Sequence, residues 1–205
     1  MSQFLNENKP IHSCSEMSCQ DCDVKNAVNC HFNKRQLTTF LLFSLPIMLL
    51  GSFGAYVYSI WAVVVQWMLY FVYFGFIEIR TMCSHCPHYG EPSIKSLKCW
   101  ANYGAPKLWK YRPGPMSYWE KFVFLMGMAT IVLFPLVMTI LAASYIIAGV
   151  YFAVVIFGYI MLETHLCNHC FNFACPLNRV KRDIRRKFRS KNPSIKDAWD
   201  KKNIE

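Results

Sequence analysis

Two long stretches of this 205-residue chain contain no Asp, Glu, Lys, Arg or His. They cover residues 36–77 and 122–162, and they are 42 and 41 residues long. Soluble proteins rarely bury an unbroken apolar helix of more than about 14 residues, whereas a membrane-spanning helix needs about 20. At ~1.5 Å per residue, either stretch would form a helix of roughly 60 Å, twice the thickness of a bilayer core. We therefore exclude an ordinary soluble domain and expect each stretch to cross the membrane twice.

The sequence also lacks the signatures of several enzyme classes. It contains no phosphate-binding Gly-rich loop, no dinucleotide fingerprint and no pattern that indicates a catalytic triad. A signal peptide is not evident, because the first apolar run begins only at Leu37, after a polar segment. Whether the chain is an enzyme, as a subunit of a membrane oxidoreductase, is left open.

The predicted fold is an all-α integral membrane protein with four transmembrane helices arranged as two hairpins. The expected spans are residues 37–56, 58–79, 122–142 and 145–163. The first turn is expected near Gly51 and Gly54, and the second near Ala142. The expected regions are a Cys-rich segment (1–36), hairpin 1 (37–79), a Cys-containing aromatic and basic loop (80–121), hairpin 2 (122–163) and a tail with a Cys motif (164–205).

Positive charge is absent from the two short turns expected on one side of the membrane. Of the 22 Lys and Arg residues, 4 precede the first helix, 7 lie in residues 80–121 and 11 follow residue 177. The positive-inside rule then predicts that both termini and the central loop are cytoplasmic. We expect a protein of the plasma (cell inner) membrane.

Cysteine is absent from the apolar runs, and all ten cysteines lie in the segments predicted to be cytoplasmic. Grouped cysteines in a reducing cytosol indicate metal binding or catalysis rather than disulfides. The inner group, which we expect to bind an iron–sulfur cluster or zinc, comprises Cys83, Cys86, Cys99, Cys167, Cys170 and Cys175. The N-terminal group, expected to hold zinc or an iron–sulfur cluster, comprises Cys14, Cys19, Cys22 and Cys30. The alternative is that these are free buried thiols.

The motif C-x-H-C occurs twice, beginning at Cys83 and Cys167, each time just after an apolar run. Two C-x-x-C pairs can complete a tetrahedral zinc site or hold an iron–sulfur cluster. His85 and His169, inside the motifs, are candidate ligands or hydrogen-bond donors to sulfur. A repeated hairpin would be a parallel repeat, which would bring the ends of the second and fourth spans together.

Glu78 and Glu163 are the carboxylates nearest the predicted membrane, each shortly before a C-x-H-C motif. Ionisable groups at membrane depth are costly and often mark proton or ion paths. We therefore predict both as candidates for proton transfer. The alternative is that each side chain reaches the headgroup layer.

The tail is strongly basic. Val180, Ile184 and Phe188 follow a spacing of four among seven Lys and Arg residues, which predicts a basic amphipathic helix. We expect this helix to lie on anionic lipids. The formal charge of +10 would also suit nucleic acid, but every basic residue lies close to a membrane segment, so no nucleic-acid partner is expected.

Two known membrane layouts are similar in part. The zinc-finger protein S-acyltransferases have four spans and a Cys-rich cytoplasmic loop, but their Asp-His-His-Cys tetrad is missing from "CSHCPHYG". The layout more closely resembles membrane electron-transfer subunits of respiratory nitrate and nitrous-oxide systems, with paired C-x3-C-P motifs at helix ends. The similarity covers residues 83–87 and 167–176, with different spacing. It implies iron–sulfur electron transfer with a quinone or a redox partner subunit.

Three functions remain in competition. The first is a membrane redox protein with iron–sulfur centres at the cytoplasmic face. The second is a non-enzymatic scaffold or anchor stabilised by zinc. The third, a metal transporter or sensor, is disfavoured because the spans offer no charged or His ligands along a path.

Overall fold

The computed structural model describes residues 6–202, which form helices and loops with one isolated β-bridge between Ser96 and Pro106. Four helices are long and apolar enough to cross a membrane. They are α1 (Lys34–Tyr58), α2 (Ile60–Val72) with its continuation to His85, α5 (Tyr118–Leu141), and α6 (Tyr145–Leu162) with its continuation to Cys167. The all-helical class and the four helices of spanning length are thereby confirmed.

Capping residues make α1 and α5 begin earlier than the sequence predicted. The Asn33 side chain accepts a hydrogen bond from the backbone N–H of Arg35, at 2.8 Å, and caps α1. Ser117 and Glu120 form a capping box, so α5 starts at Tyr118 rather than at residue 122. The predicted starts followed the edge of the uncharged run, but polar caps extend each helix beyond that edge.

The first turn lies at Ser59, so the prediction of a turn near Gly51 and Gly54 is wrong. Both glycines are inside α1 and buried. A Cβ atom added at Gly54 would lie 2.2 Å from Oγ1 of Thr139 on α5. These glycines therefore serve close packing between helices, which requires the absence of a side chain just as a turn does.

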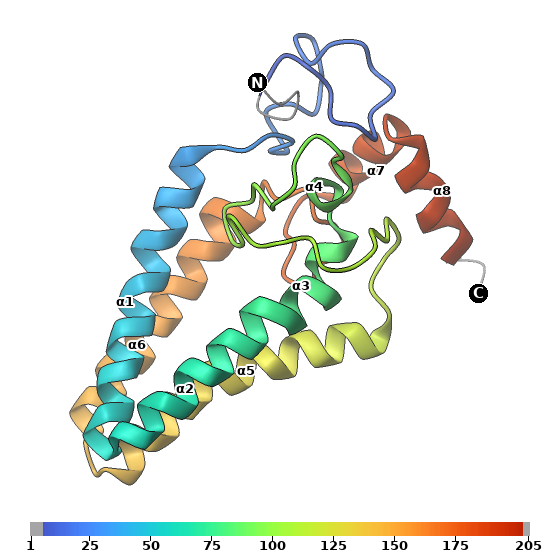
Figure 1. Cartoon of the computed structure of the whole chain (residues 1–205). Coiled ribbons are helices and arrows are strands. Elements are labelled where there is room, and N and C mark those ends of the chain that lie inside the picture. Colours follow the sequence, from blue (N-terminus) through green and yellow to red (C-terminus); the bar gives the residue numbers. More distant parts are fainter. Residues whose placement is uncertain (1–5, 203–205) are drawn as a thin grey trace.

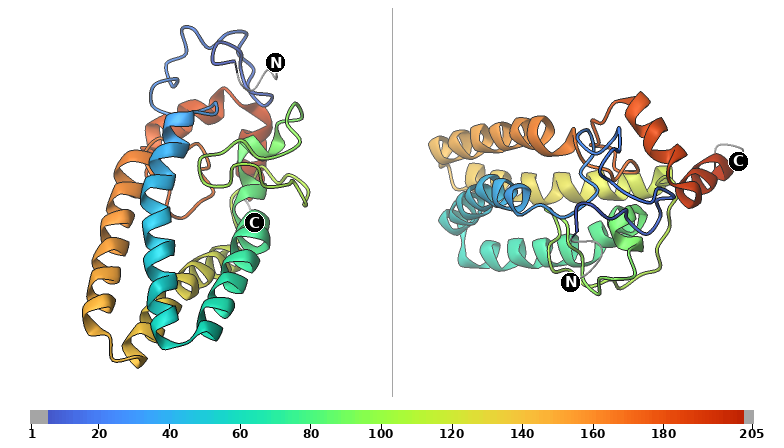
Figure 2. Two further views of the ribbon diagram at one scale, coloured as in Figure 1. Left: turned by 60° about the vertical axis from the view of Figure 1, so that its left-hand side comes forward. Right: turned by 90° about the horizontal axis from the view of Figure 1, so that it is seen from above.

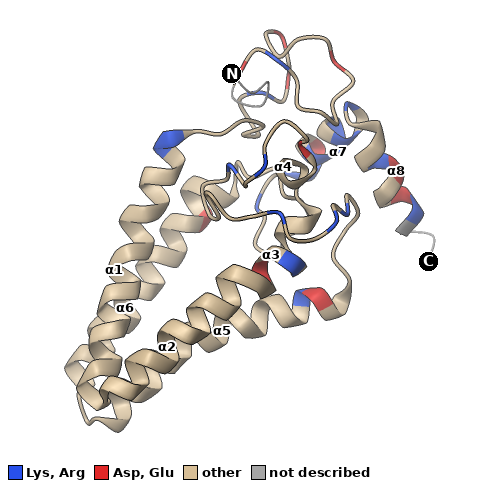
Figure 3. Cartoon of the chain, viewed as in Figure 1, with Lys and Arg blue, Asp and Glu red and all other residues tan. Residues whose placement is uncertain are grey.

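The four long helices form two arms that meet at the turns and diverge toward the other end (Figure 1). One arm contains α1 and α6, and the other contains α2 and α5 (Figures 1 and 2). The second turn lies at residues 142–144, as predicted, with Ala143 in the left-handed region (φ 54°). Charged side chains gather at the wide end, and the long helices below it carry none (Figure 3).

The second helix of each hairpin passes into a π-helical segment before its Cys motif. The segment η2 (Tyr73–Ile77) joins α2 to the short helix α3 (Glu78–Thr81), and η4 (Glu163–Cys167) continues α6. The 3₁₀ turn η3 (Cys83–His85) and helix α4 (Pro87–Gly90) then follow α3. π-Helical segments are rare and are frequent at functional sites.

A second layer of structure covers the wide end. It consists of the N-terminal segment, the loop of residues 91–117, α7 (Arg182–Ser190) and α8 (Pro193–Lys202). The predicted basic helix is present as α7, but its apolar stripe faces inward: Phe188 is 1% exposed and packs against Phe171 and Phe173. The stripe therefore joins the tail to the rest of this layer, and only the basic face remains for anionic lipids.

Candidate functional site

The two C-x-H-C motifs adopt the same tight turn. The backbone N–H of Cys86 donates to the carbonyl of Cys83 at 2.9 Å, and that of Cys170 donates to the carbonyl of Cys167 at 3.4 Å. This turn places both thiols of each motif on one side, as the C-x-x-C spacing requires.

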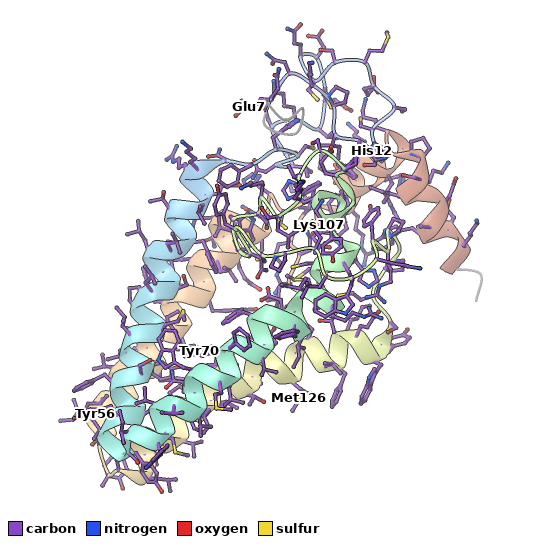
Figure 4. The ribbon with its side chains drawn as sticks, viewed as in Figure 1. Glu7, His12, Tyr56, Tyr70, Lys107 and Met126 are labelled. Carbon is purple, nitrogen blue, oxygen red and sulfur yellow. The ribbon has the colours of Figure 1, made fainter. Side chains whose placement is uncertain are left out.

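All six cysteines of the inner group line one cavity at the wide end of the helices. The cavity has a volume of about 420 Å³ and lies between the cysteine-bearing loops and the upper halves of the long helices. Tyr70 on α2, labelled in Figure 4, lies on its wall. The structure therefore brings together three segments, residues 83–86, Cys99 and 167–175, that are far apart in the sequence.

The thiols of this group are close enough to influence one another electrostatically. Burial raises the pKa of Cys170 well above its usual value, and the nearby Cys86 and Cys99 raise it further. Burial likewise raises the pKa of Cys175 to about 12, with a contribution from Cys167. Thiolates are therefore disfavoured here in the absence of positive charge, and a bound cation would reverse that balance.

Asparagine side chains hold the two motifs together. The amide of Asn172 donates to the carbonyl of Met82, at 3.2 Å, and so links the second motif to the first. The amide of Asn178 donates to the carbonyls of Cys170 (2.5 Å) and Asn172 (3.1 Å). The motifs are thus fixed to each other through backbone groups, which leaves the thiols free to face the cavity.

Glu78 and Glu163 lie in different environments. Glu78 is 6% exposed and lines the cavity, and its Oε1 accepts a hydrogen bond from the Asn102 amide at 3.1 Å. The same amide lies 3.3 Å from the Cys83 sulfur, and Oε2 of Glu78 has no partner among the described residues. Glu163 lies outside the cavity wall, paired with Arg179 at 2.6 Å. Only Glu78 is therefore placed to exchange protons with a molecule in the cavity.

The two histidines proposed as ligands do not line the cavity. His85 Nδ1 lies 2.7 Å from the carbonyl oxygen of Gly114, and its Nε2 lies 3.4 Å from Glu120. His169 Nδ1 lies 3.3 Å from the carbonyl oxygen of Ala27. Both rings hold loops in place, the first toward α5 and the second toward the N-terminal segment.

Two polar residues on the cavity wall were missed by the sequence analysis, His88 and Asn102. His88 Nε2 lies 3.3 Å from the carbonyl oxygen of Cys30, so this ring connects the cavity to the N-terminal group. Burial lowers the pKa of His88 to about 3, so the ring is neutral at physiological pH. Its position two residues after Cys86 was the available signal, whereas nothing near Asn102 in the sequence distinguishes it.

The four N-terminal cysteines form a separate group above the cavity. Burial raises the pKa of Cys30, and Cys19, Cys22 and Cys14 raise it further, so the four lie near one another. The segment is tied to the tail by Lys191, whose ammonium group lies 2.8 Å from Glu16 and 3.4 Å from Asp23. It also packs against the first motif, since Cys14, Cys30 and Cys86 share one apolar cluster.

The chemistry of the inner group suits a metal centre, although its side chains do not converge on one point. Within residues 6–202, no three His, Cys, Asp or Glu side chains are arranged to hold a metal ion. The inner group nevertheless offers six thiols around one cavity, and both zinc and iron–sulfur sites are commonly built from four. Binding would require these thiols to turn toward a common centre.

Comparison of the chain with protein-family models, with curated proteins and with solved structures finds no match, so its function has to be argued from this geometry.

Proposed function

We propose that this protein is a membrane electron-transfer protein whose inner cysteines hold an iron–sulfur cluster at the membrane surface. The observation that carries the proposal is the cavity, which collects all six inner cysteines from three separate segments. Such a cluster, when bound, would accept and release one electron at a time. The chain itself would supply the thiolate ligands, their enclosure and the backbone links that fix them.

The topology that goes with this proposal has both termini and the central loop in the cytoplasm of a cell whose plasma membrane the four helices cross. The charge distribution supports it, because the charged end in Figure 3 is the end that carries the cysteines. We also propose that the two hairpins are copies of one unit. The shared turn at each C-x-H-C motif and the π-helical segment before it support that origin.

The inner group favours iron–sulfur over zinc because six thiols surround a space larger than one ion requires. A structural zinc ion takes four ligands in a closed tetrahedron. The N-terminal group, with four cysteines in a segment that has little apolar core of its own, suits such a zinc site better. The second function, a zinc-stabilised scaffold, would follow if both groups hold zinc.

Single and combined Cys→Ser variants of the inner group test the proposal. If Cys83, Cys86, Cys167 and Cys170 serve one cluster, changing any one to Ser should reduce the iron content almost as much as changing all four. Cys22→Ser, in the other group, should leave that iron in place. Independent, additive losses from the two motifs would mean two separate sites and would contradict a shared cluster.

A further inference from the structure

The cavity extends beyond the cysteines into the membrane-spanning part of the protein. Met48 on α1, Ile131 on α5 and Val155 on α6 line it, well below the Cys motifs in the sequence of each helix. Its volume of about 420 Å³ falls within the range of pockets for small organic ligands, roughly 300–1,000 Å³. The cavity therefore has room for an organic molecule with an apolar body.

The wall of the cavity reaches the outside of the helix bundle at membrane depth. Leu45 on α1 and Tyr159 on α6 both line the cavity, and they are 48% and 41% exposed. A ligand dissolved in the bilayer could therefore enter sideways between these helices without passing through water.

The cysteine end of the cavity is polar and incompletely hydrogen-bonded. Glu78 is buried there, with one oxygen bound by Asn102 and the other without a partner among the described residues. Leaving a buried polar atom unpaired costs about 1–3 kcal/mol, so this oxygen is a site where a ligand would gain affinity. A protonated carboxyl group can donate to a carbonyl oxygen, and an ionised one can accept from a hydroxyl group.

Aromatic side chains surround the same end. Phe74, Phe124 and Phe171 line the cavity together with Glu78, and they offer flat apolar faces for a planar ring. Together these features describe a ligand with a planar, oxygen-bearing head group and an apolar tail.

We propose that the cavity binds a membrane quinone or its hydroquinone, with the head group against Glu78 and Asn102 and the tail between the helices. This inference rests on the proposed electron-transfer function for its purpose, but the binding site is defined by residues of this chain alone. Glu78 provides the hydrogen bond to the head-group oxygen, whereas Glu163 has no part in it because it lies outside the cavity.

The test uses the full chain in detergent micelles, with decylubiquinone as the probe and quenching of tryptophan fluorescence as the readout. Trp100 lines the cavity, so a bound quinone should quench it. Ile131→Trp should fill the cavity and weaken binding at least tenfold, as judged by displacement of decylubiquinone measured by equilibrium dialysis. Leu133→Trp is the matched control, because it lies two residues further along α5 and is exposed; it should bind as the wild type does.

A second pair of variants tests the head-group contact. Glu78→Leu should weaken binding about tenfold, the value of roughly one hydrogen bond, and Glu163→Leu should not. Binding that is unaffected by both Ile131→Trp and Glu78→Leu, or equal binding of a phospholipid with ten-carbon chains, would overturn the quinone site.

The metal content of each sample separates this inference from the proposed function. Failure of an iron-loaded wild-type protein to bind decylubiquinone would refute the quinone site while the iron–sulfur proposal stands. Binding by protein that contains no iron would support the quinone site and refute the cluster. A sample with neither iron nor binding would refute both.

Discussion

The contact between Gly54 on α1 and Thr139 on α5 is a sharp test of how the helices pack. A Cβ atom at position 54 would lie 2.2 Å from Oγ1 of Thr139, far inside van der Waals contact, and 3.5 Å from its Cβ. The hydroxyl group cannot simply turn away, because it donates a hydrogen bond to the carbonyl of Pro135 at 2.7 Å. Gly54→Ala therefore forces either a helix shift or the loss of that bond.

The size of the effect follows from three contributions. Overpacking a close contact costs about 1–3 kcal/mol, and losing the hydrogen bond would cost about 0.5–1.5 kcal/mol. Replacing Gly by Ala inside a helix returns up to ~1 kcal/mol. We expect Gly54→Ala to lower the free energy of unfolding by about 1–2 kcal/mol, whereas Gly149→Ala, with no atom within 4 Å of the added Cβ, should raise it slightly.

A double-mutant cycle isolates the contact. In a Thr139→Ala background, the atom nearest to the new Cβ of residue 54 would be the Cβ at 3.5 Å, which is ordinary contact. Gly54→Ala should then be neutral or stabilising, and the interaction between the two changes should be about 1–3 kcal/mol. Unfolding in mixed micelles with increasing dodecyl sulfate, followed by circular dichroism, provides the free energies. Equal effects of Gly54→Ala in both backgrounds would refute the packing described for α1 and α5.

Two further predictions concern orientation and the link between the motifs. Met17→Cys and Ile146→Cys introduce thiols at residues that are 98% and 85% exposed at opposite ends of the molecule; an impermeant maleimide should label only the second in intact cells, and labelling of the first would reverse the proposed topology. Asn172→Ala removes the hydrogen bond to the carbonyl of Met82 and should lower the free energy of unfolding by about 1 kcal/mol. Asn168→Ala removes a bond within its own exposed turn and should cost less; equal losses would mean that the link between the motifs contributes nothing.

The four long helices were predictable because the absence of charge over 42 and 41 residues leaves few alternatives in water. The first turn was not, because Gly51 and Gly54 carry the same local signal whether they permit a turn or a close helix contact. What decides between them is Thr139, which lies 85 positions after Gly54 in the sequence. Helix starts were displaced for a simpler reason, since Asn33 and Ser117 cap helices outside the apolar runs.

The candidate site was predictable in its cysteines and not in its polar contacts. The spacing of the C-x-H-C motifs indicated the thiols that line the cavity. Glu78 and Glu163, by contrast, occupy similar sequence positions, and the sequence treated them alike. They differ because Asn102, from a distant loop, encloses Glu78, while Arg179 pairs with Glu163 near the surface.

The histidines illustrate the same limit. His85 and His169 lie inside the motifs, yet the turn that directs the thiols of each motif toward the cavity directs the rings to backbone carbonyls elsewhere. His88, outside the motif, reaches the cavity wall because α4 turns the chain back after Pro87. Sequence position within a motif therefore did not decide which side chain faces the site.

The central claim is that the inner cysteines hold an iron–sulfur cluster, and the most direct test is the composition of protein purified without oxygen. Iron, acid-labile sulfide and zinc should be measured on the same sample, together with its absorption spectrum. The account predicts iron and sulfide in equal amounts, at four of each per cluster for a four-cysteine site, a broad absorption that bleaches on reduction, and loss of both in the Cys83→Ser variant. A colourless protein that contains zinc and no sulfide would contradict the account and favour the zinc-stabilised scaffold.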